Sequence, residues 1–417
     1  MAGKEYDFML FGATGYTGRL CAKFIVKNYN TNTRWAVAGR SPAALKRLVS
    51  DLAVLNPDRT PPGVVTFTKL DEAEIGPLVQ KTCVVINGIG PFHRFSTPIV
   101  AACAKSGTHY VDFTTETLWM RDIIDKYEKL AVESGAVLIP GITPGGPPDL
   151  LAYLIASEIL TIDDSGTSEV ISAGKLDIQG MSGGSATTVL DSLATWGPWW
   201  FLFGNSWILA PRATVPSKIP RPPFMSWLFG YRQVSELGGA LTTSFVGINN
   251  EPIVHRSCAK NPKLYGTKFH FKEYLPVGKS RWNFLSAGFV HFCTYFGVLV
   301  ISIPPLRALL RMLLPAAGLG PDIAEARAGE SVVYHAVGIP SSRQDMRAHA
   351  VFQRQGSLYE FTALMACVAA RVIRDKTAIR GFQGGFSTPS SLGMEYVEAL
   401  RGAGVEIGVS LEPCKLL

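Results

Sequence analysis

The sequence lacks the cysteine patterns of zinc sites and disulfide frameworks. Its seven cysteines are scattered over 417 residues, and no two of them form a C-x-x-C pair. We therefore expect no bound metal and no disulfide-stapled secreted fold. No apolar run of signal-peptide length precedes the first predicted strand. These features favour a reducing, cytoplasmic location.

Charged residues are also scarce. They make up 18% of the chain, against 47% for hydrophobic residues, and the mean hydropathy is +0.18. This composition excludes intrinsic disorder. No Lys/Arg run is long enough to predict nucleic-acid binding, whereas the net charge of +7 suits an anionic ligand or an anionic lipid surface.

Short apolar runs alternate with amphipathic stretches between Tyr6 and Ile139. This alternation predicts an α/β fold with a doubly wound parallel sheet of the Rossmann type. A Gly/Pro-rich hinge follows at 141–148, and strand-like runs at 168–177, 268–276 and 331–353 predict one further sheet. We predict a Rossmann domain over 1–145, an α+β domain with an apolar helical segment over 146–380, and a C-terminal segment, 381–417, that could return to the Rossmann domain.

Three glycines stand at every third position after the first apolar strand, where a helix begins. Gly12 permits a tight turn, Gly15 lets the main chain approach phosphates, and Gly18 allows close packing of helix on strand. The helix N-terminus adds free N–H groups and a positive dipole. The alternative is a structural glycine turn. We predict a pyrophosphate site made by Gly12, Ala13, Thr14, Gly15, Tyr16, Thr17 and Gly18.

Two further strand ends predict how the nucleotide binds. Arg40 follows the second strand, where an NAD site usually carries an acidic residue for the ribose 2′-hydroxyl. A guanidinium can instead pair with a 2′-phosphate through two hydrogen bonds, which favours NADP(H). After the fourth strand, Asn87, Gly88 and Gly90 would leave room for the nicotinamide ribose. Arg40 could also be a solvated residue, and the second run could be an ordinary βα loop.

Two common dehydrogenase signatures are missing. None of the thirteen tyrosines has Lys four residues later, so the Tyr-x-x-x-Lys pair of short-chain dehydrogenases is not present. The cysteine spacing argues against a zinc alcohol dehydrogenase. The chemistry must therefore depend on other groups.

Six short segments carry a family resemblance, and they are spread over nearly the whole chain: 12–18, 38–40, 87–92, 110–116, 183–187 and 387–393. Together they resemble the saccharopine dehydrogenase-like oxidoreductases, a family that includes trans-acting enoyl reductases serving polyketide synthases. The resemblance implies an NADP(H)-dependent, enoyl reductase-like enzyme of secondary metabolism that acts on an apolar polyketide- or lipid-like substrate. That substrate could be a small molecule or could be bound to a carrier.

The acid–base candidates near the strand ends are Asp112, Glu116, His93 and, past the hinge, Asp149. Each also has a structural interpretation. Asp112 and Glu116 could cap the helix that begins near Leu118. His93 could be a surface loop residue, and Asp149 could be an N-cap. The sequence does not choose a proton donor among them.

Residues 284–303 form a twenty-residue apolar run in which His291 is the one side chain that can carry charge near neutral pH. A helix of that length is about 30 Å long, enough to cross a bilayer core. Pro304 and Pro305 end it, and a short basic amphipathic stretch with Arg307 and Arg311 follows. Three interpretations remain: a helix on the membrane surface together with the aromatic stretch 196–207, a helix lining a lipophilic pocket, or a true span.

The functional alternatives come from different classes. The first is the reductase, peripheral on a membrane or lipid surface. The second is a nucleotide-binding membrane-surface protein without turnover, and the third is an isomerase or cyclase that retains its cofactor. The sequence does not define the oligomeric state, and a homodimer is one option.

Overall fold

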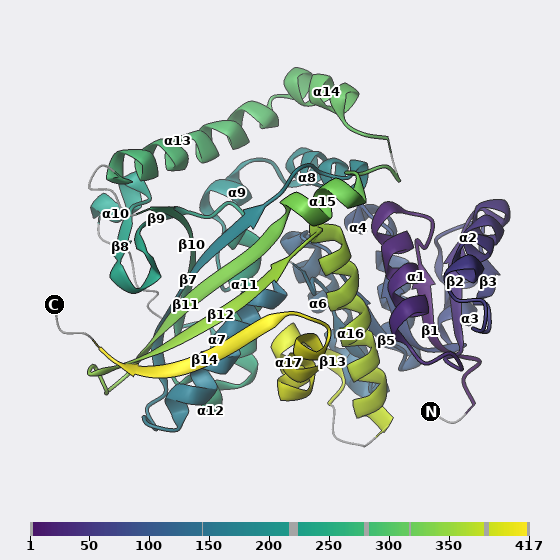
Figure 1. Ribbon diagram of the computed structural model, residues 1–417, viewed down its shortest axis with the longest axis horizontal. Coiled ribbons are helices and arrows are strands. Elements are labelled where there is room, and N and C mark those ends of the chain that lie inside the picture. The colour runs from purple at the N-terminus through teal and green to yellow at the C-terminus, as the bar shows by residue number, and fades with distance from the viewer. Residues whose placement is uncertain are drawn as a thin grey trace.

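The computed structural model describes residues 3–143, 145–216, 224–278, 283–316, 318–378 and 383–414. Pro144 of the predicted hinge lies outside the described residues, as do 1–2, 381–382 and 415–417 of the predicted domains. The described residues form two seven-stranded sheets with helices packed against them (Figure 1). The predicted fold class, a Rossmann-type sheet followed by an α+β domain, is confirmed.

The first sheet is parallel throughout and has the strand order β13-β6-β5-β4-β1-β2-β3. Its central strands are buried along nearly their whole length, as expected when helices cover both faces of a parallel sheet. Its first six strands are β1 (Tyr6–Phe11), β2 (Trp35–Gly39), β3 (Gly63–Thr66), β4 (Thr82–Asn87), β5 (His109–Asp112) and β6 (Val137–Ile139). The helices between them are α1 (Tyr16–Asn28), α2 (Pro42–Leu55), α3 (Glu72–Val79), α4 (Phe92–Phe95), α5 (Thr97–Ser106) and α6 (Thr117–Ser134).

The second sheet is mixed and has the order β14-β12-β11-β7-β10-β9-β8. Strands from 167–177, 270–278 and 331–355 thus share one sheet, as the sequence predicts. The buried helix α7 (Gly146–Leu160) packs across one face. The strands are β7 (Thr167–Asp177), β8 (Arg232–Val234), β9 (Gly239–Thr243), β10 (His270–Gly278), β11 (Ser331–Pro340), β12 (Met346–Gln355) and β14 (Glu406–Pro413), and the helices nearby are α8 (Gly183–Trp196), α11 (Gly247–Lys260) and α12 (Pro262–Tyr265).

The last part of the described chain contributes to both sheets. The long helix α16 (Leu358–Ala378) packs against α1, β4 and β5 of the first sheet, although it lies before residue 381. The short strand β13 (Gly385–Phe386) then pairs with β6. After α17 (Gly393–Gly402), β14 pairs with β12 at the edge of the second sheet. One apolar core, containing α7 and α16, joins the two sheets.

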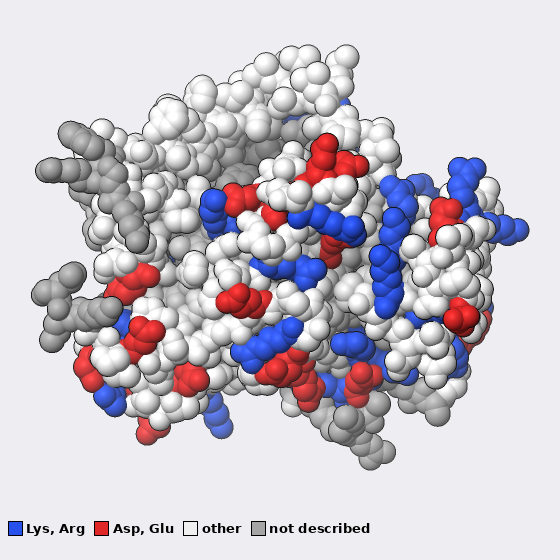
Figure 2. Space-filling model, in the orientation of Figure 1, with Lys and Arg blue, Asp and Glu red and all other residues white. Residues whose placement is uncertain are grey.

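The apolar run forms an arm along one edge of the molecule, with α13 (Asn283–Ser302) followed by α14 (Pro304–Leu313) (Figure 1). By length and composition, α13 could cross a membrane. Only 11% of its most apolar stretch is buried inside the protein. Few Lys, Arg, Asp or Glu side chains appear on the arm in Figure 2. Two short aromatic helices, α9 (Trp199–Phe203) and α10 (Phe224–Phe229), pack beneath α13. After the arm, α15 (Ile323–Gly329) leads into β11.

Candidate active site

The glycine cradle has the geometry that the spacing predicts. Gly12 has φ +71°, and a Cβ at that position would lie 2.8 Å from the backbone of Gly88. A Cβ on Gly18 would lie 2.1 Å from the carbonyl oxygen of Gly12, so α1 can approach β1 this closely only because Gly18 has no side chain. A Cβ on Gly15 would meet only the Gly12 oxygen, at 3.2 Å. The space above Gly15 is therefore open, and a pyrophosphate fits there.

The N-terminus of α1 is free to receive an anion. Gly15 is its N-cap residue, and no side chain caps it. The amides of the first turn therefore point outward with the positive end of the helix dipole. Arg19 lies beside this turn and donates to the carbonyl oxygen of Thr14 at 2.7 Å. Backbone amides and a nearby guanidinium are the groups that bind a pyrophosphate.

The ends of β2 and β4 differ in whether their polar side chain is exposed. Arg40 is exposed directly after β2 and is free to meet a 2′-phosphate. Asn87 is fully buried: its Nδ2 donates to Ser96 Oγ at 2.8 Å and to Tyr110 Oη at 2.9 Å, and its Oδ1 accepts from the backbone N–H of Ile89. Its side chain shapes the loop after β4, so Gly88 and Gly90 are left as the positions at which a nicotinamide ribose can approach the main chain.

Glu116 and His93 form a pair at the end of this loop. Glu116 is 2% exposed and accepts the backbone N–H groups of Phe92 at 2.8 Å and His93 at 2.7 Å. Its Oε2 also lies 2.7 Å from His93 Nδ1. Glu116 therefore binds the first turn of α4. Glu116 is also the N-cap residue of α6, the position that one interpretation expected, but its side chain makes no cap hydrogen bond there.

The other face of the His93 ring reaches the second domain. Its Nε2 lies 3.4 Å from Thr195 Oγ1, and the ring centroid lies 5.0 Å from that of Trp196. Both partners are at the end of α8. The His93 side chain keeps 11% of its surface exposed, so it is not the simple surface residue that one interpretation expected. A histidine with Nδ1 fixed and Nε2 facing a domain boundary can transfer a proton there.

Asp112 is held inside the first domain by hydrogen bonds. It accepts from Tyr110 Oη at 2.6 Å and from the N–H groups of Thr114 and Gly141. Burial raises the pKa of this carboxyl to about 7, against the effect of these hydrogen bonds. Asp112 therefore ties β5 to the turn after β6, and the prediction that it could cap α6 is wrong.

Asp149 lies in the first turn of α7, whose N-cap residue is Gly145, so the N-cap interpretation is wrong. Its oxygens accept from Ser257 Oγ at 2.5 Å and from the N–H of Ser390 at 2.7 Å. Burial raises its pKa to about 6. Asp149 thus joins three distant parts of the chain, and the structure does not bring it together with His93 and Glu116.

Residues 8–139 match the family model of the saccharopine dehydrogenase NADP binding domain. This segment is therefore similar to the NADP-binding domain of saccharopine dehydrogenases. The predicted family resemblance is confirmed, and so is NADP(H) as the cofactor. Gly12, Gly15 and Gly18, with the open space above Gly15, lie within the matched segment.

Similarity to curated proteins extends beyond the NADP-binding domain. A trans-acting enoyl reductase of Mycobacterium ulcerans is 28% identical over 424 residues, with 98% of this chain and 99% of the relative covered. One of Mycobacterium tuberculosis is 28% identical over 426 residues, with 98% and 99% covered. Among solved structures, apo histidine-tagged saccharopine dehydrogenase (L-Glu forming) from Saccharomyces cerevisiae shares the fold, with a TM-score of 0.50 at 12% identity over 97% of this chain and 99% of that one. These findings support an NADP-dependent oxidoreductase.

Sequence reasoning missed the residues that reach the NADP-binding domain from elsewhere. Thr195 and Trp196 meet His93 from α8. The segment after α14 contacts two side chains of α1 beside the open space, where Gly318 O accepts from Arg19 at 2.6 Å and Pro321 O accepts from Tyr16 Oη at 2.5 Å. All of these contacts join parts of the chain separated by more than 100 residues. No local sequence pattern predicts them.

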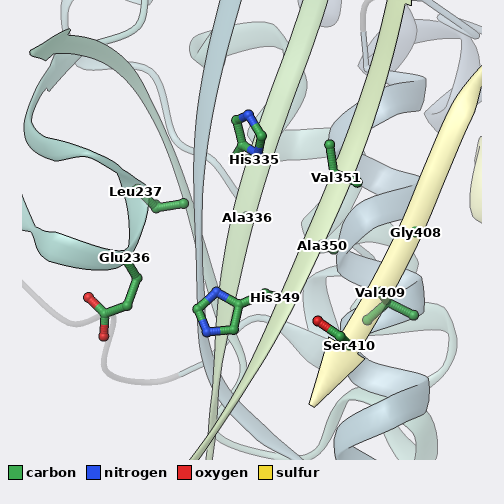
Figure 3. A pocket seen from close by; sticks show the side chains of 10 residues that line it. All are labelled: Glu236, Leu237, His335, Ala336, His349, Ala350, Val351, Gly408, Val409 and Ser410. Carbon is green, nitrogen blue, oxygen red and sulfur yellow. The ribbon is translucent and has the colours of Figure 1, made fainter. Parts of the chain in front are cut away.

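A concavity of about 330 Å³ lies on the face of the second sheet opposite α7 (Figure 3). His335 of β11 and His349 of β12 project into it, and Glu236 lines it from the short turn between β8 and β9, with its carboxylate directed away from the two histidines. Among the described residues, no group of three His, Cys, Asp or Glu side chains could hold a metal ion. Because it lies on the side of the sheet away from α7, we do not assign it to the reductase site.

Proposed function

We propose that this protein is an NADP(H)-dependent reductase of a carbon–carbon double bond conjugated to a carbonyl group, on an apolar polyketide- or lipid-like substrate. The observation that carries the proposal is the His93–Glu116 pair, which lies after the nicotinamide-facing loop and against α8 of the second domain. Similarity to trans-acting enoyl reductases over 98% of the chain supports the reaction type.

The residues divide the work as follows. NADPH, when bound, supplies the hydride for the β-carbon of the substrate. Gly15 and the first turn of α1 would hold its pyrophosphate, and Arg40 would hold its 2′-phosphate. Glu116 accepts the Nδ1 proton of His93 and fixes the ring, so that the protonated ring presents its Nε2–H toward the domain boundary. His93 then gives this proton to the α-carbon side of the substrate.

We also propose that the enzyme is cytoplasmic and works on a membrane or lipid surface. Large apolar side chains are exposed on four neighbouring helices, and they define what we call the apolar surface: Trp199, Phe203, Phe224, Trp227, Leu228, Phe229, Phe284, Leu285, Phe289, Phe292, Phe296, Leu299, Leu306, Leu309, Met312 and Leu313. A contiguous apolar patch of this kind is rare on soluble monomers. It supports the surface interpretation of α13.

Two observations argue against a true span. β10 precedes the arm and β11 follows it, and both pair with β7. The chain would therefore have to recross the bilayer, but α14 has ten residues and is about 15 Å long, half of a bilayer core. Arg311 also forms an ion pair with buried Asp191 of α8, which fixes α14 to the body of the protein. Arg311 therefore adds less to lipid binding than a free arginine.

The function is tested with NADPH and a trans-2-enoyl thioester of medium chain length, with absorbance at 340 nm and product mass as readouts. We expect NADPH consumption and a product two mass units heavier than the substrate. His93→Gln should slow turnover without weakening NADPH binding. If NADPH binds but no enoyl, carbonyl or imine compound oxidises it, the result would favour the alternative of a nucleotide-binding membrane-surface protein without turnover. A product of unchanged mass with the cofactor retained would identify an isomerase or cyclase.

A further inference from the structure

A second cavity lies under the arm, enclosed by α9, α10, α11, α13 and the ends of β9 and β10, with a volume of about 170 Å³. The NADP-binding domain contributes none of its lining residues. Its floor carries charged side chains, whereas its roof mixes the apolar Leu202 and Val298 with His291, Thr294 and Tyr295. This division of chemistry suggests what the cavity can bind.

Three charged side chains make the floor. Lys272 Nζ lies 3.0 Å from Glu251 Oε1. Glu273 accepts from Ser244 Oγ and from Asn250 Nδ2, each at 2.8 Å. Burial raises the pKa of Glu273 to about 7 and also raises that of Glu251, although Lys272 opposes the shift for Glu251. Because Lys272 pairs with Glu251 and Glu273 accepts two hydrogen bonds, the floor offers several hydrogen-bonding groups and little unpaired charge.

The roof leads outward to the apolar surface. Leu202 of α9 and Val298 of α13 are buried and belong to one apolar cluster with Leu193 of α8. Trp227 and Phe245 also line the cavity, and they are 58% and 39% exposed. The cavity thus opens between aromatic side chains, and Trp227 belongs to the apolar surface defined above.

We propose that this cavity binds an amphiphile with an uncharged polar head, a hydroxyl or a carbonyl, whose apolar chain leaves past Trp227 and Phe245. Lys272 and Glu251 already form an ion pair. An anionic head would have to compete with Glu251 for Lys272, and a cationic head would have to compete with Lys272 for Glu251. A neutral head can accept from Lys272 and can donate to or accept from Glu273, so the floor selects it.

The first turn of α11 connects this cavity with the proposed reductase site. Asn250 and Glu251 form part of the floor or its support, whereas the preceding Asn249 accepts from Thr117 Oγ1 at 2.8 Å. Thr117 follows Glu116 in the chain. A head group bound on the floor would therefore lie on the other side of this helical turn from the His93–Glu116 pair. Binding in the cavity does not require turnover, so it can be tested without the proposed function.

The test uses isothermal titration calorimetry with decanol, decanoate and decyltrimethylammonium below their aggregation concentrations. They share one chain and differ in head charge. We expect wild type to bind decanol at least about tenfold more tightly than either ion. Similar affinities for all three would overturn the proposal, because an apolar surface alone would suffice.

Two variants locate the site. Thr294→Phe places a ring in the cavity and should weaken decanol binding at least tenfold, whereas Cys293→Phe places it on the exposed side of the same helix and should not. Leu202→Trp fills the cavity from α9 and should act like Thr294→Phe. NADPH affinity and melting temperature report on folding in each case. Unchanged decanol binding in both filling variants would overturn the proposal. Loss of enoyl turnover alone would count only against the proposed function.

Discussion

The cofactor cradle and the cavity under the arm are built in opposite ways. The cradle is one run of seven residues, Gly12 to Gly18, which follows β1 directly and includes the first turn of α1. The cavity takes its lining from segments between Phe201 and Val298, on both helices and strands. A contiguous site depends on local backbone geometry, so a single side chain can destroy it. The cavity can likewise be filled by one large side chain, whereas the apolar surface beside it depends on total buried area, so its loss requires changes at several positions.

The largest effect should come from the apolar surface, if several positions change together. Burying one Phe- or Leu-sized side chain in lipid is worth roughly 1.5–3 kcal/mol. Wild type should float with anionic vesicles and stay bound at high salt, whereas the combined variant Phe289→Asp, Phe292→Asp and Leu299→Asp should stay in the soluble fraction. Wild type that is soluble and monodisperse without detergent would contradict the surface interpretation. Resistance to alkaline extraction, with protease-accessible sites on both sides of the vesicle membrane, would instead show that α13 spans the membrane.

In the cradle, one substitution should be enough to abolish cofactor binding. Gly15→Val places a branched side chain where the pyrophosphate lies, and we expect NADPH affinity to fall at least about 1,000-fold, equivalent to roughly 4 kcal/mol, with little change in melting temperature. Gly402→Val is a suitable control, because no atom lies within 4 Å of the added Cβ. Titration calorimetry measures both. An unaltered affinity for Gly15→Val would place the cradle elsewhere.

His93 lies where the two regions meet. His93→Gln should lower kcat by roughly 10²–10⁴-fold, the usual contribution of a positioned general acid, with unchanged NADPH affinity. Glu116→Gln should have a smaller effect and should shift the pH profile of kcat, because the group that orients the ring is changed. If His93→Gln retains full turnover at every pH, the proton comes from solvent.

Arg40 should contribute selectivity and little else. A charge-assisted hydrogen-bonding pair is worth roughly 1.5–3 kcal/mol, so Arg40→Ala should weaken NADPH about 10- to 100-fold and leave NADH unchanged. Equal affinities of wild type for NADPH and NADH would contradict the assignment. Arg47→Ala, on the helix after β2, controls for a general loss of positive charge.

The smallest effect concerns the pH dependence of stability. Asp112 has a pKa of about 7 in the folded protein and close to 4 when unfolded, so between these values the folded state binds a proton that the unfolded state has lost. Its contribution to the free energy of unfolding is therefore present below pH 4 and is lost as pH rises to 7, with a slope of up to about 1.4 kcal/mol per pH unit. Asp112→Asn should remove this slope. Urea unfolding of both proteins at pH 4.5, 6 and 7.5 measures the difference, and parallel curves would contradict it.

The first sheet and the cradle could be predicted from sequence because their determinants are local. The strand before Gly12 and the helix after it lie within one short segment, and the apolar alternation repeats from unit to unit. The second sheet could be predicted in outline, since its strands have recognisable lengths. The order in which its strands pair could not be predicted, because β7 pairs with β10, before the arm, and with β11, after it.

Among the acid–base candidates, the sequence named both His93 and Glu116 but could not predict that they contact each other. Asp112 and Glu116 have the same polar character and similar spacing from the strand. Only the tertiary contacts separate them: Asp112 accepts from Gly141, across the next strand, whereas Glu116 accepts from His93. The contacts of His93 with Thr195 and Trp196 of α8 could not be predicted either, because they too are tertiary contacts between distant parts of the chain.

The position of α16 has a consequence for how the protein is made. This helix covers the face of the first sheet that carries Val84, Ile86 and Val111, yet the ribosome adds it long after those strands. At about 5–20 residues per second, that face waits on the order of ten seconds or more for its cover. The nascent chain therefore presents an apolar sheet face to the cell during synthesis, and a chaperone that holds it would protect the first domain until α16 arrives.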